Sequence, residues 1–455
     1  MQDKILENKI LAIEETRFVQ IPGPNPLLIP GEPGSWDDGM LEMCDILKDH
    51  GKYYLYYHAT GRGESYRIGV AVADSPLGPF YKHGDAPILD LTGFGNSGND
   101  RYIACGSVFK EAENKYYLYY SLQQRDDQLN YYIGFATAEH PLGPWKKSEK
   151  NPILVNFGYV GGVTKKGGKY YMFNEYPTRV QACDYGHISV AVADSPEGPW
   201  EACKDAPVMS VENWGTWDDA GYSESKVSFD GNLFQMFYGG AKTHPNRLLS
   251  QESIGYAYSA DGKQFIKYGK NPVARREEIY YGAAMAECCF LAEYPYIYVY
   301  HTLRYTKPWL PQDSHKFPSM EHIGVQVLSV ADRFTVPYTV YEIPTLAAGA
   351  EASCLTCGKL PLSIGNADRF SLTVKCTYPK GEKHLRGITV ALRCGDREEE
   401  LDTVDSYCFG GVPGEGETVQ CRFRGELCAR FADVIVRNPN GVPLTDVSVT
   451  VTLKG

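Results

Sequence analysis

One short pattern of residues recurs along most of the chain. In its first copy, the aromatic run Lys52–His58 is followed by the Pro- and Gly-rich segment Val72–Phe80 and then by Ala86–Leu89. Five copies follow one another at a spacing of roughly 55 to 65 residues, which indicates a repeat architecture. The later copies read Lys115–Ser121, Thr137–Trp145 and Asn151–Leu154; Lys169–Glu175, Val192–Trp200 and Ala206–Met209; Leu233–Tyr238, Ile254–Tyr258 and Asn271–Val273; and Tyr296–His301 with Ile323–Val327.

Each copy has the composition of strands joined by turns. Aromatic and β-branched residues stand in short runs separated by Gly, Pro, Asp and Asn, and no helical periodicity accompanies them. Sheets of this kind stack around an axis, and a closed ring leaves only short edges unprotected. We therefore predict an all-β fold with a five-bladed β-propeller. The repeated Ser-Pro-Leu-Gly-Pro segments fit tight turns, so we interpret them as structural.

The repeat ends before the chain does. Its last residues are Tyr341–Pro344, and the small residues of Thr345–Ala350 are typical of a linker. Alternating strands such as Phe370–Val374 and Val447–Val451 follow. We predict a propeller domain over residues 1–344 and a C-terminal β-sandwich over residues 345–455.

Charge and cysteine content restrict the partners and the compartment. The formal net charge of −11 argues against a nucleic acid or an anionic membrane as partner. Met1–Asn8 has no apolar signal-peptide core, and no later stretch reaches transmembrane length. The thirteen cysteines show no disulfide framework, and we interpret the pair Cys354 and Cys357 as plain thiols. We expect a cytoplasmic protein, and its oligomeric state stays open.

Acidic residues precede several of the aromatic runs, where inner propeller strands would converge. Gly34–Asp45 and Gly215–Lys226 both place Trp-Asp-Asp shortly before a glutamate. Converging acids repel unless one keeps a proton or a cation lies between them, so such a group favours a chemical role. The alternative is that the paired aspartates form Asx turns. The candidate carboxylates are Asp37, Asp38, Glu42, Asp100, Glu224 and Glu287.

Paired carboxylates beside an aromatic ring suit cleavage of a glycosidic bond. We predict Glu224 as the general acid. Asp38 is the first choice for the base or nucleophile, followed by Glu42 and Asp37. Only one of Asp37 and Asp38 can face the axis, because successive side chains of an extended segment point to opposite sides. Trp36 and Trp217 would form walls for the sugar ring.

Histidines end two of the aromatic runs. His301 closes the fifth run and is followed by Arg304, His58 has the same place in the first, and Glu175 has it in the third. Such a histidine is either a packing residue or a group that binds a cation or carries a proton. We expect that no cofactor is required, and we assign no metal ligand. A structural cation in the central channel is compatible with the sequence. The predicted substrate-binding residues are Trp36, Trp217, Glu175, Glu287, His301 and Arg304.

These motifs resemble those of the five-bladed β-propeller glycoside hydrolases, the superfamily of glycoside hydrolase families 43, 32, 62, 68, 117 and 130. The resemblance covers roughly residues 20–340 and rests on the Lys52–Tyr57 type of strand, the Ala73–Phe80 type of turn and the Asn151–Leu154 type of segment. It implies a base in the first blade and an acid such as Glu224 in a later one. Gly158–Gly162 stands where family 43 has a modulating aspartate, so Asp100 or Glu175 would take that part. A role for His301 would be similar to family 117.

Three functions are compatible with this resemblance. The first is an exo-acting glycosidase on a small oligosaccharide or glycoside. The second is a phosphorylase in the manner of family 130, with Arg62, Lys226 and Arg304 as possible phosphate ligands. The third is a carbohydrate-binding propeller without catalysis.

Overall fold

The structure of the protein is a computed structural model. It describes residues 2–61, 65–91, 100–127, 130–176, 186–203, 207–211, 214–243, 251–275, 283–305, 320–397, 400–416, 418–426 and 429–455. Strands form nearly all of the regular structure in these ranges, which confirms the predicted all-β fold. No helix among these residues is long and apolar enough to cross a membrane.

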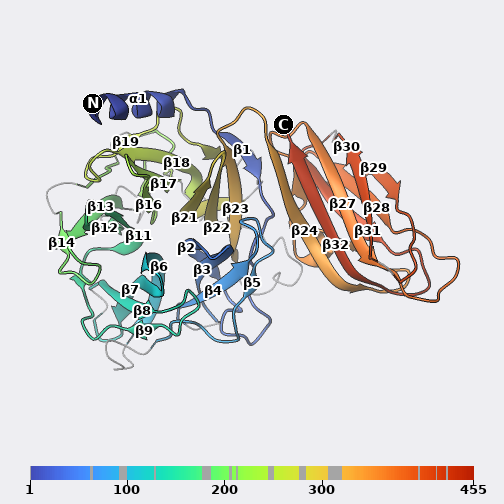
Figure 1. Cartoon of the computed structure of the whole chain (residues 1–455), viewed down its shortest axis with the longest axis horizontal. Coiled ribbons are helices and arrows are strands. Elements are labelled where there is room, and N and C mark those ends of the chain that lie inside the picture. Colours follow the sequence, from blue (N-terminus) through green and yellow to red (C-terminus); the bar gives the residue numbers. More distant parts are fainter. Residues whose placement is uncertain are drawn as a thin grey trace.

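Five sheets contain the strands between residues 19 and 329 (Figure 1). The first holds β2 (Leu41–Asp49), β3 (Lys52–Ala59), β4 (Arg67–Ala73) and β5 (Tyr81–Lys82). The second holds β6 (Asp100–Ala112), β7 (Lys115–Gln124), β8 (Tyr132–Ala138), β9 (Lys146–Lys147) and β10 (Leu154–Val155). The third holds β11 (Tyr159–Lys166), β12 (Lys169–Tyr176), β13 (His187–Ala193) and β14 (Glu201–Ala202).

The remaining two sheets complete this part of the chain. The fourth holds β15 (Gly221–Tyr222), β16 (Lys226–Phe229), β17 (Phe234–Ala241), β18 (Gln251–Ser259), β19 (Ile266–Lys267) and β20 (Ala274–Arg275). The fifth holds β21 (Ala283–Glu293), β22 (Tyr296–Tyr305), β23 (Met320–Ser329) and β1 (Val19–Pro22).

The five sheets form a ring. Their innermost strands β2, β6, β11, β16 and β21 contact one another in this order, and β21 contacts β2. Strand β1, which precedes the first sheet in the sequence, pairs with β23 and completes the fifth sheet, with Val19 opposite Ser329. The backbone pairing between β1 and β23 therefore ties the first strand of the ring to its last sheet.

Tyrosines of the aromatic strands tie neighbouring sheets together. The hydroxyl of Tyr56 donates to the carbonyl of Pro141 at 2.7 Å, and that of Tyr300 donates to the carbonyl of Pro76 at 2.7 Å. Both prolines lie in the repeated Pro-Gly turns, each in the sheet next to that of its tyrosine. These contacts agree with a structural role for the repeated turns, because a buried hydroxyl needs a partner.

One helix, α1 (Gln2–Glu15), lies outside the ring at its edge (Figure 1). The sequence analysis did not predict it. The ammonium group of Lys270 lies 2.6 Å from the carbonyl of Glu14 at the C-terminal end of the helix, and Tyr258 donates to the Glu14 carboxylate at 3.0 Å. Cations near a helix C-terminus are stabilising, so contacts remote in sequence hold this helix.

The C-terminal part contains two sheets that pack face to face (Figure 1). One has the order β24 (Thr335–Leu346), β32 (Leu444–Lys454), β27 (Arg369–Thr377) and β30 (Thr418–Gly425). The other contains β25 (Glu351–Ser353), β31 (Phe431–Arg437), β28 (Thr389–Gly395) and β29 (Asp402–Gly410), with β26 (Leu362–Ser363) beside β31. A short 3-10 helix, η5, spans Leu355–Cys357.

Strand β24 runs across the position where the sequence placed the domain boundary. It pairs with β32 from Thr335 to Leu346, and thus belongs to the C-terminal sheets along its whole length. Its alternating pattern resembled one more strand of the repeat, which is why the sequence did not separate it from the propeller.

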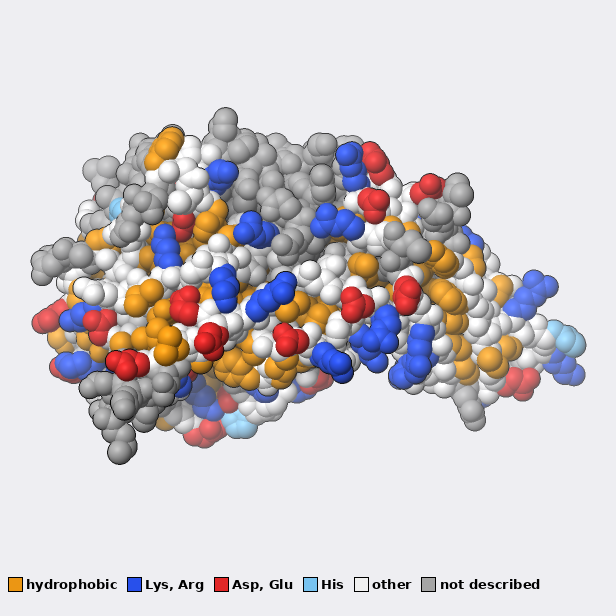
Figure 2. All heavy atoms as spheres, turned by 90° about the horizontal axis from the view of Figure 1, so that it is seen from above, with side chains coloured by type: hydrophobic (Ala, Val, Ile, Leu, Met, Phe, Trp, Pro, Cys, Tyr) orange, Lys and Arg blue, Asp and Glu red, His pale blue; other side chains and the backbone are white. Residues whose placement is uncertain are grey.

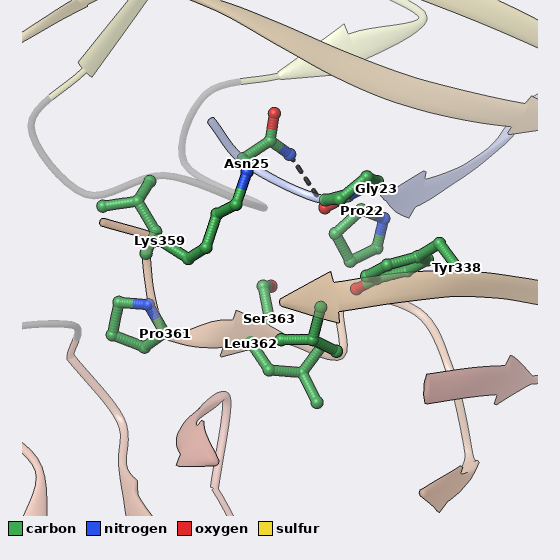
Figure 3. Close-up of a pocket in the computed structure, with 11 residues that line it drawn as sticks. Pro22, Gly23, Asn25, Tyr338, Lys359, Pro361, Leu362 and Ser363 are labelled. Atoms are coloured by element: carbon green, nitrogen blue, oxygen red, sulfur yellow. Dashed lines mark hydrogen bonds between the residues drawn. The ribbon is translucent and has the colours of Figure 1, made fainter. Parts of the chain in front are cut away.

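The two parts share a junction behind β1 (Figure 3). The amide of Leu360 donates to the carbonyl of Asn25 at 2.9 Å, and the ammonium of Lys359 donates to the carbonyl of Pro26 at 2.9 Å. Between Pro22, Tyr338 and these residues is a cavity of about 20 Å³, enough for about one water molecule. Burial lowers the pKa of Lys359 to about 8.

Candidate active site

Arg304 lies among three glutamates at one end of the ring. Its Nη2 is 2.8 Å from Oε1 of Glu287 and 3.3 Å from Oε1 of Glu42, and its Nε is 2.5 Å from Oε1 of Glu321. Glu42 comes from the first sheet and the other three residues from the fifth. All four side chains are mostly buried, with at most 14% of each exposed. A buried group of this kind is costly to assemble and is typical of a functional site.

Bulges in the inner strands present two of the glutamates. In the fifth sheet Ala286 pairs with Thr302 and Cys288 with His301, so Glu287 is the unpaired residue of a β-bulge. In the fourth sheet Tyr222 pairs with Gly240 and Lys226 with Phe237, so the segment with Glu224 has one residue more than the β17 segment opposite it and forms a second bulge. A bulge redirects a side chain and is frequent beside active sites.

Glu224 and Glu287 are on neighbouring inner segments. The amide of Cys288 donates to the carbonyl of Glu224 at 3.4 Å, and Ser225 forms a parallel bridge with Cys288. The Glu224 charge contributes to the raised pKa of Glu287. The predicted acid Glu224 therefore borders the group around Arg304.

Glu42 lies between two cations. Its Oε1 also accepts a hydrogen bond from the Tyr66 hydroxyl at 3.3 Å, and its Oε2 contacts Nε2 of His58. Burial raises the pKa of the Glu42 carboxyl, but the charges of His58 and Arg304 outweigh burial and hold this pKa well below its usual range. Glu42 is thus an ionised carboxylate at neutral pH.

His58 carries the matching charge. Burial lowers the pKa of its imidazole, but Cys44, whose Sγ is 3.3 Å from Nδ1, and Glu42 together raise it well above its usual value. Because His58 is almost fully buried, solvent only weakly screens the attraction between the His58 imidazolium and the Glu42 carboxylate.

The pKa of Glu287 is raised, whereas that of Glu42 is lowered. Burial, together with the charges of Glu42 and Glu224, raises its pKa to about 7, although Arg304 lowers it. Its Oε2 is buried and has no hydrogen-bond partner among the described residues. Burial and Glu42 likewise raise the pKa of Glu321 well above its usual range. One cluster therefore holds both an ionised carboxylate and carboxyls that keep protons, the arrangement needed for acid–base chemistry.

Two of the predicted aspartates, Asp37 and Asp100, belong to a structural pattern that recurs in three sheets. Asp37 Oδ2 is 2.6 Å from the ammonium of Lys82, and Asp100 Oδ2 is 3.0 Å from that of Lys147. Asp218, in the fourth sheet, is 2.7 Å from Lys267 in the same way. Each lysine comes from the short outer strand of the aspartate's own sheet. A pair that recurs in three sheets is expected of a structural contact, whereas a catalytic group is needed once.

Asp38 also has a counterpart. Its Oδ2 accepts a hydrogen bond from the amide of Gly34 at 2.7 Å, and Asp219 accepts one from Gly215 at 2.8 Å. Each contact joins an aspartate to the amide four residues before it, which is a structural contact within one loop but not an Asx turn, whose side chain bonds the backbone two residues on. Asp38 as the base stays a prediction that this geometry does not favour.

The two predicted aromatic walls pack within their sheets. Trp36 stacks on Tyr57 with ring centroids 5.9 Å apart, and Trp217 stacks on Tyr238 at 5.8 Å. A Cβ atom added at Gly240 would lie 2.1 Å from the ring of Trp217, so this glycine makes room for the indole. Both indoles are half-buried and keep some exposed surface.

Glu175 and His301 are buried in their sheets. Glu175 lies in β12 opposite Tyr159. His301 is fully buried, its Nε2 is 3.5 Å from the amide nitrogen of Gln326, and burial lowers its pKa to about 4. A neutral imidazole at physiological pH is a poor proton donor, so His301 is less suited to that role than His58.

Two of the three possible phosphate ligands, Lys226 and Arg304, already contact carboxylates. Lys226 contacts Asp45 and donates to the carbonyl of Ile46 at 3.0 Å, which links the fourth sheet to the first across the ring. Arg304 is surrounded by carboxylates, and Arg62 lies outside the described residues. In the part of the chain that the structure describes, no group of three or more His, Cys, Asp or Glu side chains could hold a metal ion.

The sequence analysis missed Glu321 and gave no role to His58. Arg304 is directly opposite Glu321 in the pairing of β22 with β23, and His58 is opposite Glu42 in the pairing of β3 with β2. Opposite charges at facing positions of paired strands are the signal that could have found both.

Comparison with known proteins supports the resemblance to the propeller glycoside hydrolases. No protein-family model matches the chain. A 120-residue segment is 31% identical to a xylosidase/arabinosidase of Bacteroides ovatus, and covers 26% of this chain and 33% of that protein. An 85-residue segment is 34% identical to a β-xylosidase of Xylanibacter ruminicola, and covers 19% of this chain and 23% of that one.

Thus the matched segments span a third or less of these curated relatives. The structure also resembles a solved glycoside hydrolase with a TM-score of 0.50 at 12% identity, over 70% of this chain and 94% of that one. At this identity the likeness shows a shared fold.

Proposed function

We propose that the chain is a glycosidase whose acid and base are carboxylates of the group around Arg304. The observation that carries this proposal is the separation of pKa values within one cluster: Glu42 is held ionised, while the pKa of Glu287 is raised to about 7. Pairs of carboxyls whose environments push their pKa values apart are the mark of acid–base assignments.

In this mechanism Glu287 donates its proton to the glycosidic oxygen as the bond from the anomeric carbon to that oxygen breaks. The bonding electrons leave with the oxygen. Glu42 either removes a proton from a water molecule that attacks the anomeric carbon, or attacks it directly and is released by water in a second step. Both routes consume one water molecule and end with a free sugar and a free aglycone.

Glu224 is the alternative proton donor. It was the acid expected from the sequence, and it borders Glu287. The unpartnered, buried Oε2 and the raised pKa favour Glu287, with the Glu224 charge as one source of that pKa. Asp38, Asp37 and Asp100 are kept as proposals for the base only if the Glu42 variant stays active.

The substrate class follows from the named relatives. Two of them are described as acting on xylosides or arabinosides, so we propose small pentosides cleaved from one end. A phosphorylase is less favoured, because Arg304 and Lys226 already contact carboxylates, and phosphate would compete with them. A binding propeller without catalysis would not need a carboxyl with a pKa near 7.

We further interpret the ring as a five-bladed β-propeller and the two C-terminal sheets as a β-sandwich. The cyclic contacts of five inner strands support the first, and the shared core of two facing sheets supports the second. Since β24 pairs with β32, we place the domain boundary in the segment between Ser329 and Thr335. A cytoplasmic location and a cation in the channel stay predictions.

The test is hydrolysis of nitrophenyl β-xylopyranoside and α-arabinofuranoside, with and without inorganic phosphate. We expect turnover of at least one substrate that phosphate does not accelerate, and loss of at least a hundredfold in Glu42→Gln. Strict dependence on phosphate would establish the phosphorylase. No turnover together with tight sugar binding would establish the binding propeller.

A further inference from the structure

The outer face of β27, β30 and β32 carries five cations. Side chains alternate between the faces of a strand, and Phe370, Leu372 and Val374 of β27 point into the core. Their neighbours point outward together with residues of the paired strands. Among these outward side chains, the cations are Arg369, Lys375, Arg422, Arg424 and Lys454, all of them exposed. We call this surface the cationic face.

The cations are neighbours across the strands. Arg424 lies opposite Ser371, and Arg422 lies opposite Thr373, with Nε of Arg422 3.3 Å from the Thr373 hydroxyl. Arg369 lies opposite Lys454. Adjacent strands are about 4.8 Å apart and alternate residues about 6.7 Å apart, so these charges form a closely spaced group.

Among the described residues no salt bridge neutralises this group, although Glu426 is one of the residues that line one end of the face. Among the described residues, no Asp or Glu lies within 4.0 Å of any of the five cations. Elsewhere some surface lysines and arginines are paired, as in Lys52 with Asp74 and Arg437 with Glu351. In a chain of net charge −11, five neighbouring cations on one face favour an anion as ligand.

The face is also hollowed at one end. A depression of about 510 Å³ is lined by the cations Arg369, Arg424 and Lys454 together with Phe370, Ser371, Gly425 and Glu426. Seen from above, Lys and Arg side chains gather where the C-terminal sheets adjoin the ring (Figure 2).

The composition of the face selects the ligand. Between the cations stand hydroxyl side chains, among them Thr373, Thr450 and Thr452, which can hydrogen-bond sugar hydroxyls. The outward residues of β27, β30 and β32 include no aromatic ring, and Phe370, which lines the depression, is buried. Single-stranded nucleic acids, in contrast, are bound by stacking of their bases on aromatic side chains. Arginine forks suit carboxylates.

We propose that the cationic face binds an anionic polysaccharide through the carboxylates of its uronic acid residues. The choice of a glycan rests on the proposed glycosidase activity, while the choice of an anion rests on the charges alone. Bound there, a polymer would be held on the C-terminal sheets.

Binding to glucuronoxylan tests this proposal, with the same polymer after chemical reduction of its carboxyl groups as matched ligand. We expect affinity electrophoresis at low salt to show binding to the acidic polymer and at least tenfold weaker binding to the reduced one. The variant Arg422→Gln/Arg424→Gln should bind at least tenfold more weakly. The control variant Lys146→Gln/Lys383→Gln, which removes two exposed cations elsewhere, should bind like the wild type. Added salt should weaken the wild-type complex more than that of the Arg422/Arg424 variant.

Equal binding to the acidic and reduced polymers would overturn the proposal, as would unchanged binding by the Arg422/Arg424 variant. Binding to single-stranded DNA but not to glucuronoxylan would assign the face to another polyanion and also overturn it. Hydrolysis of a nitrophenyl pentoside is measured on the same samples. Because that small substrate does not need the cationic face, its turnover tests the proposed glycosidase separately.

Discussion

Nη2 of Arg304 lies 2.8 Å from Oε1 of Glu287, yet the pKa of this carboxyl is raised to about 7. An arginine beside a carboxyl ordinarily lowers its pKa. Here burial and the charges of Glu42 and Glu224 outweigh the arginine. Arg304 is shared among three glutamates, so one positive charge cannot hold all of them ionised.

The pH dependence of kcat/KM should show a falling limb with an apparent pKa near 7. The protonated form of Glu287 is the active one, so activity is present below pH 7 and is lost as the pH rises through the pKa of Glu287. The measurement is kcat/KM from pH 4 to 9 in the wild type and in Glu287→Gln. If the residual activity of Glu287→Gln still falls with an apparent pKa near 7, a group other than Glu287 causes the falling limb.

Removing the shared charge should disable the site. We expect Arg304→Met to lower kcat/KM by a hundredfold or more, because buried carboxyls then lack their counterion. The pKa of Glu287 should rise, so the falling limb of the remaining activity moves to higher pH. Arg304→Lys is the matched control, because it keeps the positive charge but loses the planar guanidinium group. In this variant the falling limb should lie closer to its wild-type pH than in Arg304→Met. A wild-type pH profile in Arg304→Met would contradict the account.

The pairing of His58 with Glu42 should affect both the stability of the fold and the acid limb of the pH dependence of kcat/KM. The pKa of Glu42 is lowered in the folded state, so Glu42 stabilises the fold above its unfolded pKa of about 4.3, and this stability is lost as the pH falls. The pKa of His58 is raised, so its contribution is full below its unfolded value of about 6.5 and is lost as the pH rises through the folded value.

In His58→Gln the pKa of Glu42 should therefore rise. We expect the acid limb of kcat/KM to move upward by about one pH unit or more. Circular dichroism at each pH separates this effect from unfolding. If the acid limb stays in place in folded protein, His58 does not control Glu42.

Asp38 and Asp219 provide a matched pair for the structural interpretation. Each accepts a hydrogen bond from a glycine amide, at 2.7 Å and 2.8 Å. If both aspartates are structural, Asp38→Asn and Asp219→Asn should each lower the free energy of unfolding by about 1 kcal/mol and leave turnover within a few-fold. Urea unfolding and kcat measure the two effects. A thousandfold loss of kcat in Asp38→Asn alone, with stability intact, would restore Asp38 as the base.

Much of the fold could be predicted, because the repeat has a period that local composition reveals. The aromatic strands and Pro-Gly turns recur as units, and the contact of Tyr300 with Pro76 shows why both recur together. Helix α1 could not be predicted in this way. Ile10 and Ile13 of this helix pack against the ring, and Lys270 and Tyr258, which hold its end, are remote in sequence.

The site was harder to predict than the fold. The sequence analysis named Glu42, Glu224, Glu287 and Arg304, but strict alternation of side chains fails at the bulges that carry Glu224 and Glu287. The bulge positions depend on strand register, which composition does not reveal. The Trp-Asp-Asp segments recur, and recurrence itself points to structure, as the repeated pairs of Asp37 with Lys82 and Asp218 with Lys267 show.

The dependence of rate on the leaving group in Glu287→Gln and Glu224→Gln tests the central claim most directly. A leaving group that departs as a stable anion needs no proton from the enzyme, whereas an alkyl or sugar alcohol does. We predict that Glu287→Gln keeps most of its turnover on a dinitrophenyl pentoside and loses at least a hundredfold on an unactivated disaccharide, while Glu224→Gln loses similar factors on both. If Glu224→Gln instead shows the selective loss and Glu287→Gln does not, Glu224 is the proton donor and the assignment of Glu287 is wrong.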